Sequence, residues 1–212
     1  MFELSGGDLR IATSEPNRSD TATRVEAFLR AWEFQAELRF GYPVLEFVPP
    51  DAVFPDEQIA AGIPSEASAD EGLIIEWSSY PEPPSIRFVP ELHEAWRRFR
   101  EARLGIGEPV QSATYFLLTV LDGLGGGGRR KAANGFGVSF AILRKIGELS
   151  TVWSDSRTRK SVPGDAPRLT ARHERWLETS IRLVLLHVGA AMAGADPPRL
   201  EMADLPDFPA AV

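Results

Sequence analysis

Cysteine is absent from this 212-residue sequence, which excludes disulfides, cysteine-ligated zinc and thiol nucleophiles. Histidine is scarce as well: His93, His173 and His187 lie far apart in the sequence and form neither H-x-x-H nor H-E-x-x-H. No G-x-S-x-G nucleophile elbow occurs. We therefore predict no metal site and no cofactor.

Long apolar runs are also missing. No stretch approaches the eighteen apolar residues that a membrane-spanning helix requires, so we predict no membrane span. The opening MFELSGGDLR has no basic segment followed by an apolar core, so we expect no signal peptide and a cytoplasmic protein. The apolar fraction of 43% and the charged fraction of 25% are those of an ordinary globular chain, which can bury a core.

Charge is distributed unevenly along the chain. The formal net charge is −7, yet residues 129–160 carry eight basic side chains against only Glu148 and Asp155. Residues 1–90 are strongly acidic by comparison. Because binding of a polyanion depends on the local field rather than on net charge, the basic segment is a candidate binding region.

Residues 1–89 have a mixed pattern. Residues 20–39 carry apolar side chains at helical spacing, with Asp20 or Thr21 as N-cap. Residues 44–48, 73–77 and 86–89 are short apolar runs between turn-forming segments, which is typical of strands. We predict a small domain at 1–89, in which the helix packs on a sheet.

Residues 90–212 have a helical pattern. Helices are predicted from Pro90 to near Gly105, from Val110 to Gly123, and from a cap at Thr170 to about residue 194. The prediction for the whole chain is an α+β fold: the small N-terminal sheet domain is followed by a helical bundle domain at 90–212.

A glycine run follows the second of these helices. Gly123, Gly125 and Gly128 match G-x-G-x-x-G, but the residues before them keep helical rather than strand period. A P-loop would need Lys-Ser/Thr where Arg129 and Arg130 stand. We interpret Gly123 as a helix C-cap and the following glycines as a flexible link.

The segment KAANGFGVSFAILRKI at 131–146 has the spacing of a helix-turn-helix. Small residues at 132 and 133 would let two helices cross closely, and Gly137 falls where the turn needs a left-handed backbone. Val138 would fill the turn and Ser139 would cap the second helix. The same unit also occurs as plain packing in helical bundles, so both interpretations stay open.

The basic segment and the helix-turn-helix spacing coincide. We predict that nucleic acid, either DNA or structured RNA, contacts this segment mainly through its backbone, because the second helix begins with apolar residues and has no base-reading Asn or Gln. The predicted nucleic-acid-binding residues are Arg129, Arg130, Lys131, Ser139, Arg144, Lys145, Arg157, Arg159 and Lys160.

Arg182 and His187 form a second candidate site in the last predicted helix. Their R-x4-H spacing resembles that of HEPN domains, a family of helical ribonucleases. The resemblance implies a metal-independent ribonuclease, in which Arg182 would stabilise phosphate charge and His187 would move a proton, usually across a dimer interface. Two apolar stripes on the helix at 170–194 agree with burial or with a homodimer contact.

The segments SATYFLLTVLD, SFAILRKIGELS and EMADLP, together with TRK at 158–160, resemble a group of poorly characterised bacterial proteins. Some of these are described as methylamine-utilisation accessory proteins of the MauJ type. The resemblance covers residues 92–206 and implies a bacterial cytoplasmic protein, without implying any catalytic residue.

Three functional hypotheses follow from the sequence. The leading one is a non-enzymatic protein that contacts nucleic acid through residues 129–160. The second is a HEPN-like ribonuclease, acting as a toxin or defence protein through Arg182 and His187. The third is an accessory protein whose basic segment docks an acidic protein partner.

Overall fold

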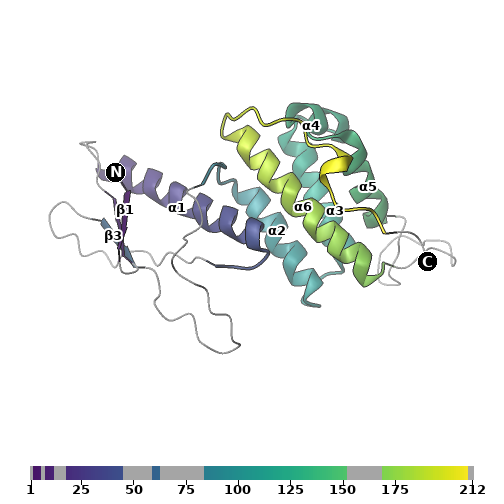
Figure 1. Ribbon diagram of the computed structural model, residues 1–212, viewed down its shortest axis with the longest axis horizontal. Helices are drawn as coiled ribbons and strands as arrows, with labels where there is room; N and C mark the ends of the chain where they lie inside the picture. The colour runs from purple at the N-terminus through teal and green to yellow at the C-terminus, as the bar shows by residue number, and fades with distance from the viewer. Residues whose placement is uncertain are drawn as a thin grey trace. The chain divides into compact units, whose positions relative to one another are not determined.

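The computed structural model describes residues 2–5, 8–11, 18–44, 59–62, 84–151 and 169–209. The chain divides into two compact units, Met1–Pro84 and Ser85–Val212. Most of the described residues lie in helices, as Figure 1 shows. The predicted α+β fold is therefore wrong, because the described chain is mainly helical. That the two parts are separate domains, with a boundary after residue 89, stays a prediction.

The sheet predicted from residues 44–48, 73–77 and 86–89 is not found among the described residues. The strands described are three four-residue segments, β1 (Phe2–Ser5), β2 (Asp8–Ile11) and β3 (Ile59–Gly62). They pair antiparallel in the order β1-β2-β3, and none of them coincides with a predicted strand. Residues 45–48 and 73–77 lie outside the described part, and residues 86–89 are not a strand. Three strands of four residues each do not form the predicted sheet domain.

The apolar run at 86–89 packs against a helix instead of joining a sheet. Ile86 and Val89 are both buried, and the Arg87 amide donates to the carbonyl of Gly189 at 3.0 Å. A Cβ atom on Gly189 would stand 2.9 Å from Cβ of Ile86, so the glycine lets this segment approach closely. Burial in a helical unit therefore accounts for the apolar residues that suggested a strand.

In the first unit, α1 (Arg18–Phe40) confirms the predicted helix. Asp20 and Thr21 lie inside it, so the predicted N-cap is wrong. Leu29, Trp32 and Ala36, which are spaced three and four residues apart, are buried. Burial in the second half of α1 extends around the helix to further residues, namely Ala31, Phe34, Gln35, Glu37 and Leu38.

The second unit is a helical bundle. Its helices are α2 (Pro90–Arg103), α3 (Val110–Leu124), α4 (Arg129–Gly135), α5 (Phe140–Thr151) and α6 (Ala171–Met192), followed by the 3-10 turn η1 (Met202–Asp204). The predicted helices that begin at Pro90, at Val110 and after the cap at Thr170 are confirmed. α4 and α5 are the two helices expected from the spacing at 131–146.

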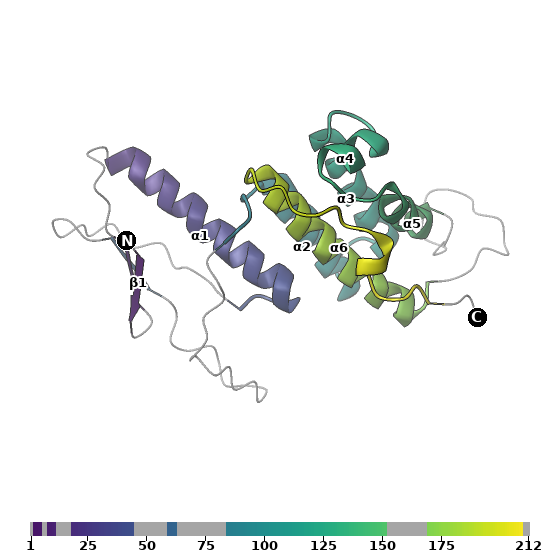
Figure 2. The same ribbon diagram turned by 45° about the horizontal axis from the view of Figure 1, so that its top comes forward.

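The apolar stripes of these helices form the core of the second unit. Trp96 and Phe99 of α2 stack with ring centroids 5.9 Å apart and are almost fully buried. α3 packs against α2, α4 and α5, and α6 lies beside α2 in both views (Figures 1 and 2). Arg103 of α2 forms an ion pair with Glu178 of α6. The helices thus bury their apolar faces against one another, as the sequence period requires.

The N-terminus of α6 is capped as predicted. The Thr170 hydroxyl accepts from the backbone amide of His173, and the Thr170 amide donates to Nδ1 of His173 at 3.3 Å. In this reciprocal capping box a histidine stands where glutamate or glutamine is usual. The cap fixes where α6 begins after the gap in the described residues.

Candidate polyanion-binding surface

The α4–α5 unit is built as the sequence spacing predicts. Ala132 and Ala133 of α4 are fully buried. Gly137 has φ of 66°, the left-handed conformation that a side chain disfavours. Val138 is buried, and its amide donates to the carbonyl of Ala133 at 2.9 Å. These findings confirm the geometry of the turn but leave its role in binding a prediction.

The glycine run is a tight link, and its amides are directed inward. α3 continues through Gly123 and ends at Leu124, so the predicted C-cap at Gly123 is wrong by two residues, and Gly125 takes that position. The amides of Gly125 and Gly127 donate to the carbonyls of Leu121 and Asp122. These two amides are thus used by the chain itself, which argues against a phosphate cradle.

The three following glycines, Gly126, Gly127 and Gly128, have φ between 84° and 97°. L-residues rarely adopt this conformation, so glycine is needed for the chain to turn from α3 into α4 within so few residues. The link therefore positions α4, and it is the side chains of α4 that are presented for binding.

Arg129 is partly buried, with 28% of its side chain exposed, and its guanidinium is engaged by other parts of the chain. Its Nη2 lies 3.5 Å from Oδ2 of Asp122, across the glycine link. Its guanidinium also lies so close to Gly147 of α5 that a Cβ atom there would collide with it. Nε of Arg129 and Oδ1 of Asp122 are buried without hydrogen-bond partners. Arg129 thus ties α3, α4 and α5 together, and this engagement makes it less available to an external phosphate than the exposed Arg130.

Arg130 and Lys131 are exposed on α4. The guanidinium carbon of Arg130 stands 5.3 Å from the ring centroid of Phe140, the first residue of α5. Nζ of Lys131 lies 3.5 Å from the carbonyl oxygen of Gly126. Both side chains carry their positive charge in contact with solvent, as contact with a phosphate backbone requires.

Two further cations project from α5. The Arg144 side chain is 66% exposed and its Nε lies 3.5 Å from Glu148. The Lys145 side chain is 34% exposed and its Nζ lies 2.8 Å from the same carboxylate. One carboxylate is thus shared by two cations, so the surface stays positive. We name the four side chains Arg130, Lys131, Arg144 and Lys145 the basic face.

Ser139 does not belong to this face. It is 9% exposed and its amide donates to the carbonyl of Leu200 at 2.8 Å. The Leu200 amide in turn donates to the carbonyl of Gly137 at 2.9 Å, so residues 138 and 200 form a parallel bridge. The C-terminal segment therefore covers the turn at the start of α5, which no local sequence signal could have indicated.

The C-terminal segment is held at further points. Nε1 of Trp176 donates to the carbonyl of Pro206 at 2.8 Å, and the Phe208 ring packs 5.2 Å from that of Trp176. Nζ of Lys145 stands 4.6 Å from the centroid of Phe208. The remaining predicted binding residues, Arg157, Arg159 and Lys160, lie outside the described residues.

Arg182 and His187 lie on α6, partly buried. Nε2 of His187 is buried without a hydrogen-bond partner and faces the turn, 3.3 Å from where a Cβ of Gly137 would stand. Burial lowers the pKa of His187, while the backbone at Gly137 and Phe136 and the Asp204 carboxylate raise it in part. Burial also lowers the pKa of Arg182. Nε2 of His187 is thus directed into the protein, toward the α4–α5 turn.

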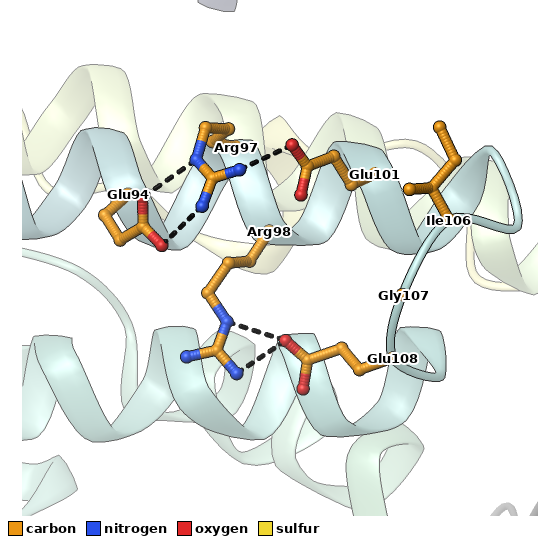
Figure 3. Close-up of a pocket in the computed structure, with 7 residues that line it drawn as sticks. All are labelled: Glu94, Arg97, Arg98, Glu101, Ile106, Gly107 and Glu108. Carbon is orange, nitrogen blue, oxygen red and sulfur yellow. Dashed lines mark hydrogen bonds and ion pairs between the residues drawn. The ribbon is translucent and has the colours of Figure 1, made fainter.

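A charged depression of about 300 Å³ lies between α2 and the start of α3 (Figure 3). Arg97 bridges Glu94 and Glu101, and the hydrogen bond from Arg97 lowers the pKa of Glu94. Arg98 reaches Glu108 at 2.6 Å and stands 3.9 Å above the ring of Phe116. Every charge drawn in Figure 3 is therefore paired, which favours a structural role.

The chain matches no family model, no curated protein and no solved structure. The resemblances to MauJ-type proteins and to HEPN domains therefore stay predictions. In the part of the chain that the structure describes, no helix is long and apolar enough to span a membrane. Among the same residues, no group of three metal-ligating side chains gathers.

Proposed function

We propose that this chain is a non-enzymatic bacterial protein that binds nucleic acid through the basic face. The observation that carries the proposal is that α4 and α5 pack together and carry Arg130, Lys131, Arg144 and Lys145 on their solvent-accessible sides. Glu148 neutralises this charge only in part. A cluster of exposed cations on an acidic protein creates a local attractive field for a polyanion. We place the protein in the cytoplasm, in keeping with the absence of cysteine.

The binding set differs from the one that the sequence predicted. Arg129 is used internally against Asp122 and Gly147, and Ser139 is covered by Leu200. The proposal therefore rests on four side chains, and these supply charge rather than base-reading groups. Contact with phosphates, with little sequence preference, is the mode that they support.

A ribonuclease that uses Arg182 and His187 has less support. A general acid or base must reach the proton that it transfers, and Nε2 of His187 is enclosed against the α4–α5 turn. Leu183 and Leu186 on α6 are partly exposed, so a homodimer through this helix stays a prediction. The basic face could equally meet an acidic protein, and competition between the two ligands would distinguish them.

The proposal is tested by reversing the charge of Arg130, Lys131 and Arg144 together to glutamate. Arg24, Arg30 and Arg39 of α1, which are also exposed, give a control variant with the same change in net charge. We expect binding of a labelled oligonucleotide, measured by fluorescence anisotropy, to weaken steeply with salt in the wild type. In the α4–α5 variant, binding should weaken strongly, and the salt dependence of the remaining binding should shrink by about 0.7–0.9 in log–log slope per lost phosphate contact.

Two results would overturn the proposal. One is the absence of salt-dependent binding to DNA or RNA by the wild-type protein. The other is an equal loss of binding in the control variant, because it would assign the effect to net charge alone. Binding of an acidic protein that nucleic acid cannot displace would favour the accessory-protein hypothesis instead.

A further inference from the structure

We propose that the nucleic acid bound here is single-stranded, and that one unstacked base lies on the paired Arg130 guanidinium and Phe140 ring. This inference deepens the proposed function and rests on it. It starts from a pairing that the charge pattern did not reveal: an exposed arginine held at 5.3 Å over the ring of a partly exposed phenylalanine, at the edge of the basic face.

The solvent-facing side of α5 forms one continuous sector. Its buried residues point into the core, and the residues that are not buried are Phe140, Ala141, Arg144, Lys145, Glu148 and Thr151. At about 100° per residue, Phe140 and Lys145 border this sector, and Arg144 follows Phe140 one turn later on the same side. A single strand of nucleic acid that lies along this side of α5 would meet the Phe140 ring and then the strongly exposed Arg144.

This combination is the one that single strands need. Proteins that bind single strands without sequence preference use cations for the backbone and flat side chains on which bases stack. An arginine over an aromatic ring adds a second planar group, on which a base can stack as well. In a duplex the faces of the bases are already stacked on one another. A ring and a guanidinium on the surface of α5 would therefore find no free base face on which to stack.

The neighbourhood of α5 also disfavours a duplex groove. The backbone at Gly137 and Ser139, just before α5, is bridged to Leu200, so the C-terminal segment lies beside the end of the helix that would enter the groove. Glu148 stands in the middle of the exposed sector of α5. If α5 lay in a duplex groove, this negative side chain would face phosphates or base edges. A single strand can keep its phosphates on the side of Arg130, Lys131 and Arg144.

The ring of Phe208 is a different case. Lys145 stands over it, but the ring also packs against Trp176 and His173, with centroids 5.2 Å and 5.4 Å away. It therefore anchors the C-terminal segment, and we assign the stacking position to the Arg130–Phe140 pair and not to Phe208.

The test compares a 15-nucleotide oligothymidine with a duplex hairpin of similar charge, both labelled, in anisotropy titrations at two salt concentrations. We expect the single strand to bind more tightly. Phe140→Leu should weaken single-strand binding about tenfold and leave both the duplex affinity and the salt slope unchanged, because one stacking contact is lost and no charge is. Phe140→Tyr, which keeps the ring, should bind like the wild type.

Tyr115→Leu is the matched control, since it removes an exposed ring of α3 outside the basic face. It should change neither affinity. If Phe140→Leu does not fold, Phe140→Trp provides a second measurement: its added fluorescence should be quenched by oligothymidine and not by the hairpin.

The outcomes separate the two proposals. Equal or tighter duplex binding, with Phe140→Leu silent and the charge-reversal variant inactive, would overturn the single-strand inference and leave the proposed function standing. No salt-dependent binding of either oligonucleotide would overturn both. A loss of binding in Tyr115→Leu equal to that in Phe140→Leu would also count against the assigned stacking position.

Discussion

Gly123 and Gly125 lie two residues apart, yet a methyl group should have opposite effects at the two positions. Gly123 is an exposed residue inside α3, and a Cβ atom there would meet nothing within 4 Å. At Gly125 a Cβ atom would stand 2.8 Å from the amide nitrogen of Ala132 and even closer to its Cα. The first glycine is tolerated by the helix, whereas the second is required by the close approach of α4.

We therefore predict that Gly123→Ala raises the free energy of unfolding by about 0.5–1 kcal/mol, because alanine favours helix over glycine. Gly125→Ala should lower it by about 1–3 kcal/mol through overpacking against α4. Urea denaturation checks both values, with equal m-values as evidence that only stability has changed. A neutral Gly125→Ala would contradict the close packing of the link on Ala132.

His187 gives a pH-dependent prediction at the same scale. Because burial lowers its pKa in the folded protein, the unfolded chain takes up the proton first as pH falls. The contribution of His187 to stability is thus fully present above its ordinary pKa of about 6.5 and is lost as pH falls below that value. We expect the stability difference between the wild type and His187→Gln to become less favourable to the wild type between pH 7.5 and pH 5.

Thermal and urea unfolding at several pH values measure this difference. His173 has a pKa lowered mainly by burial as well, so both proteins should lose stability in acid, and only the difference between them reports on His187. A difference that does not vary with pH would show that the folded protein protonates His187 as readily as the unfolded chain does.

At the scale of elements, the C-terminal segment and the α4–α5 turn depend on each other. Two backbone hydrogen bonds join Leu200 to the turn, one in each direction. Because Leu200→Pro removes the amide that donates to Gly137, we expect a loss of about 1 kcal/mol and faster hydrogen exchange at the Ser139 amide. Leu200→Ala keeps both bonds and should leave exchange at Ser139 slow. Equal exchange in the two variants would mean that the bridge does not protect the turn.

At the scale of the whole molecule, the boundary between the two units can be tested by truncation. The structure places residues 85–89 with the second unit, since Ile86 packs on Gly189 and the Arg87 amide bonds to its carbonyl. We predict that a fragment 85–212 unfolds cooperatively and is more stable than a fragment 90–212, which lacks two buried side chains. Equal stability of the two fragments would support the boundary after residue 89.

The helical half could be predicted from the sequence because its signals are local. The period of apolar residues in α3 and α6, the Thr170 cap and the left-handed Gly137 each depend on residues within a few positions of one another. The strand prediction at 86–89 failed because an apolar run indicates only that a segment is buried. Whether it pairs in a ladder or packs on a helix depends on Gly189, about a hundred positions away.

By itself, then, the sequence determined where the helices of the second unit form and where a basic segment lies between them. Only the tertiary structure decided which of the predicted binding residues remain available: it engaged Arg129 with Asp122, beside Gly147, and covered Ser139 with Leu200. It also buried Nε2 of His187 against the turn. The physical reason is that helix formation follows from near neighbours, whereas the exposure of a side chain depends on distant segments that pack over it.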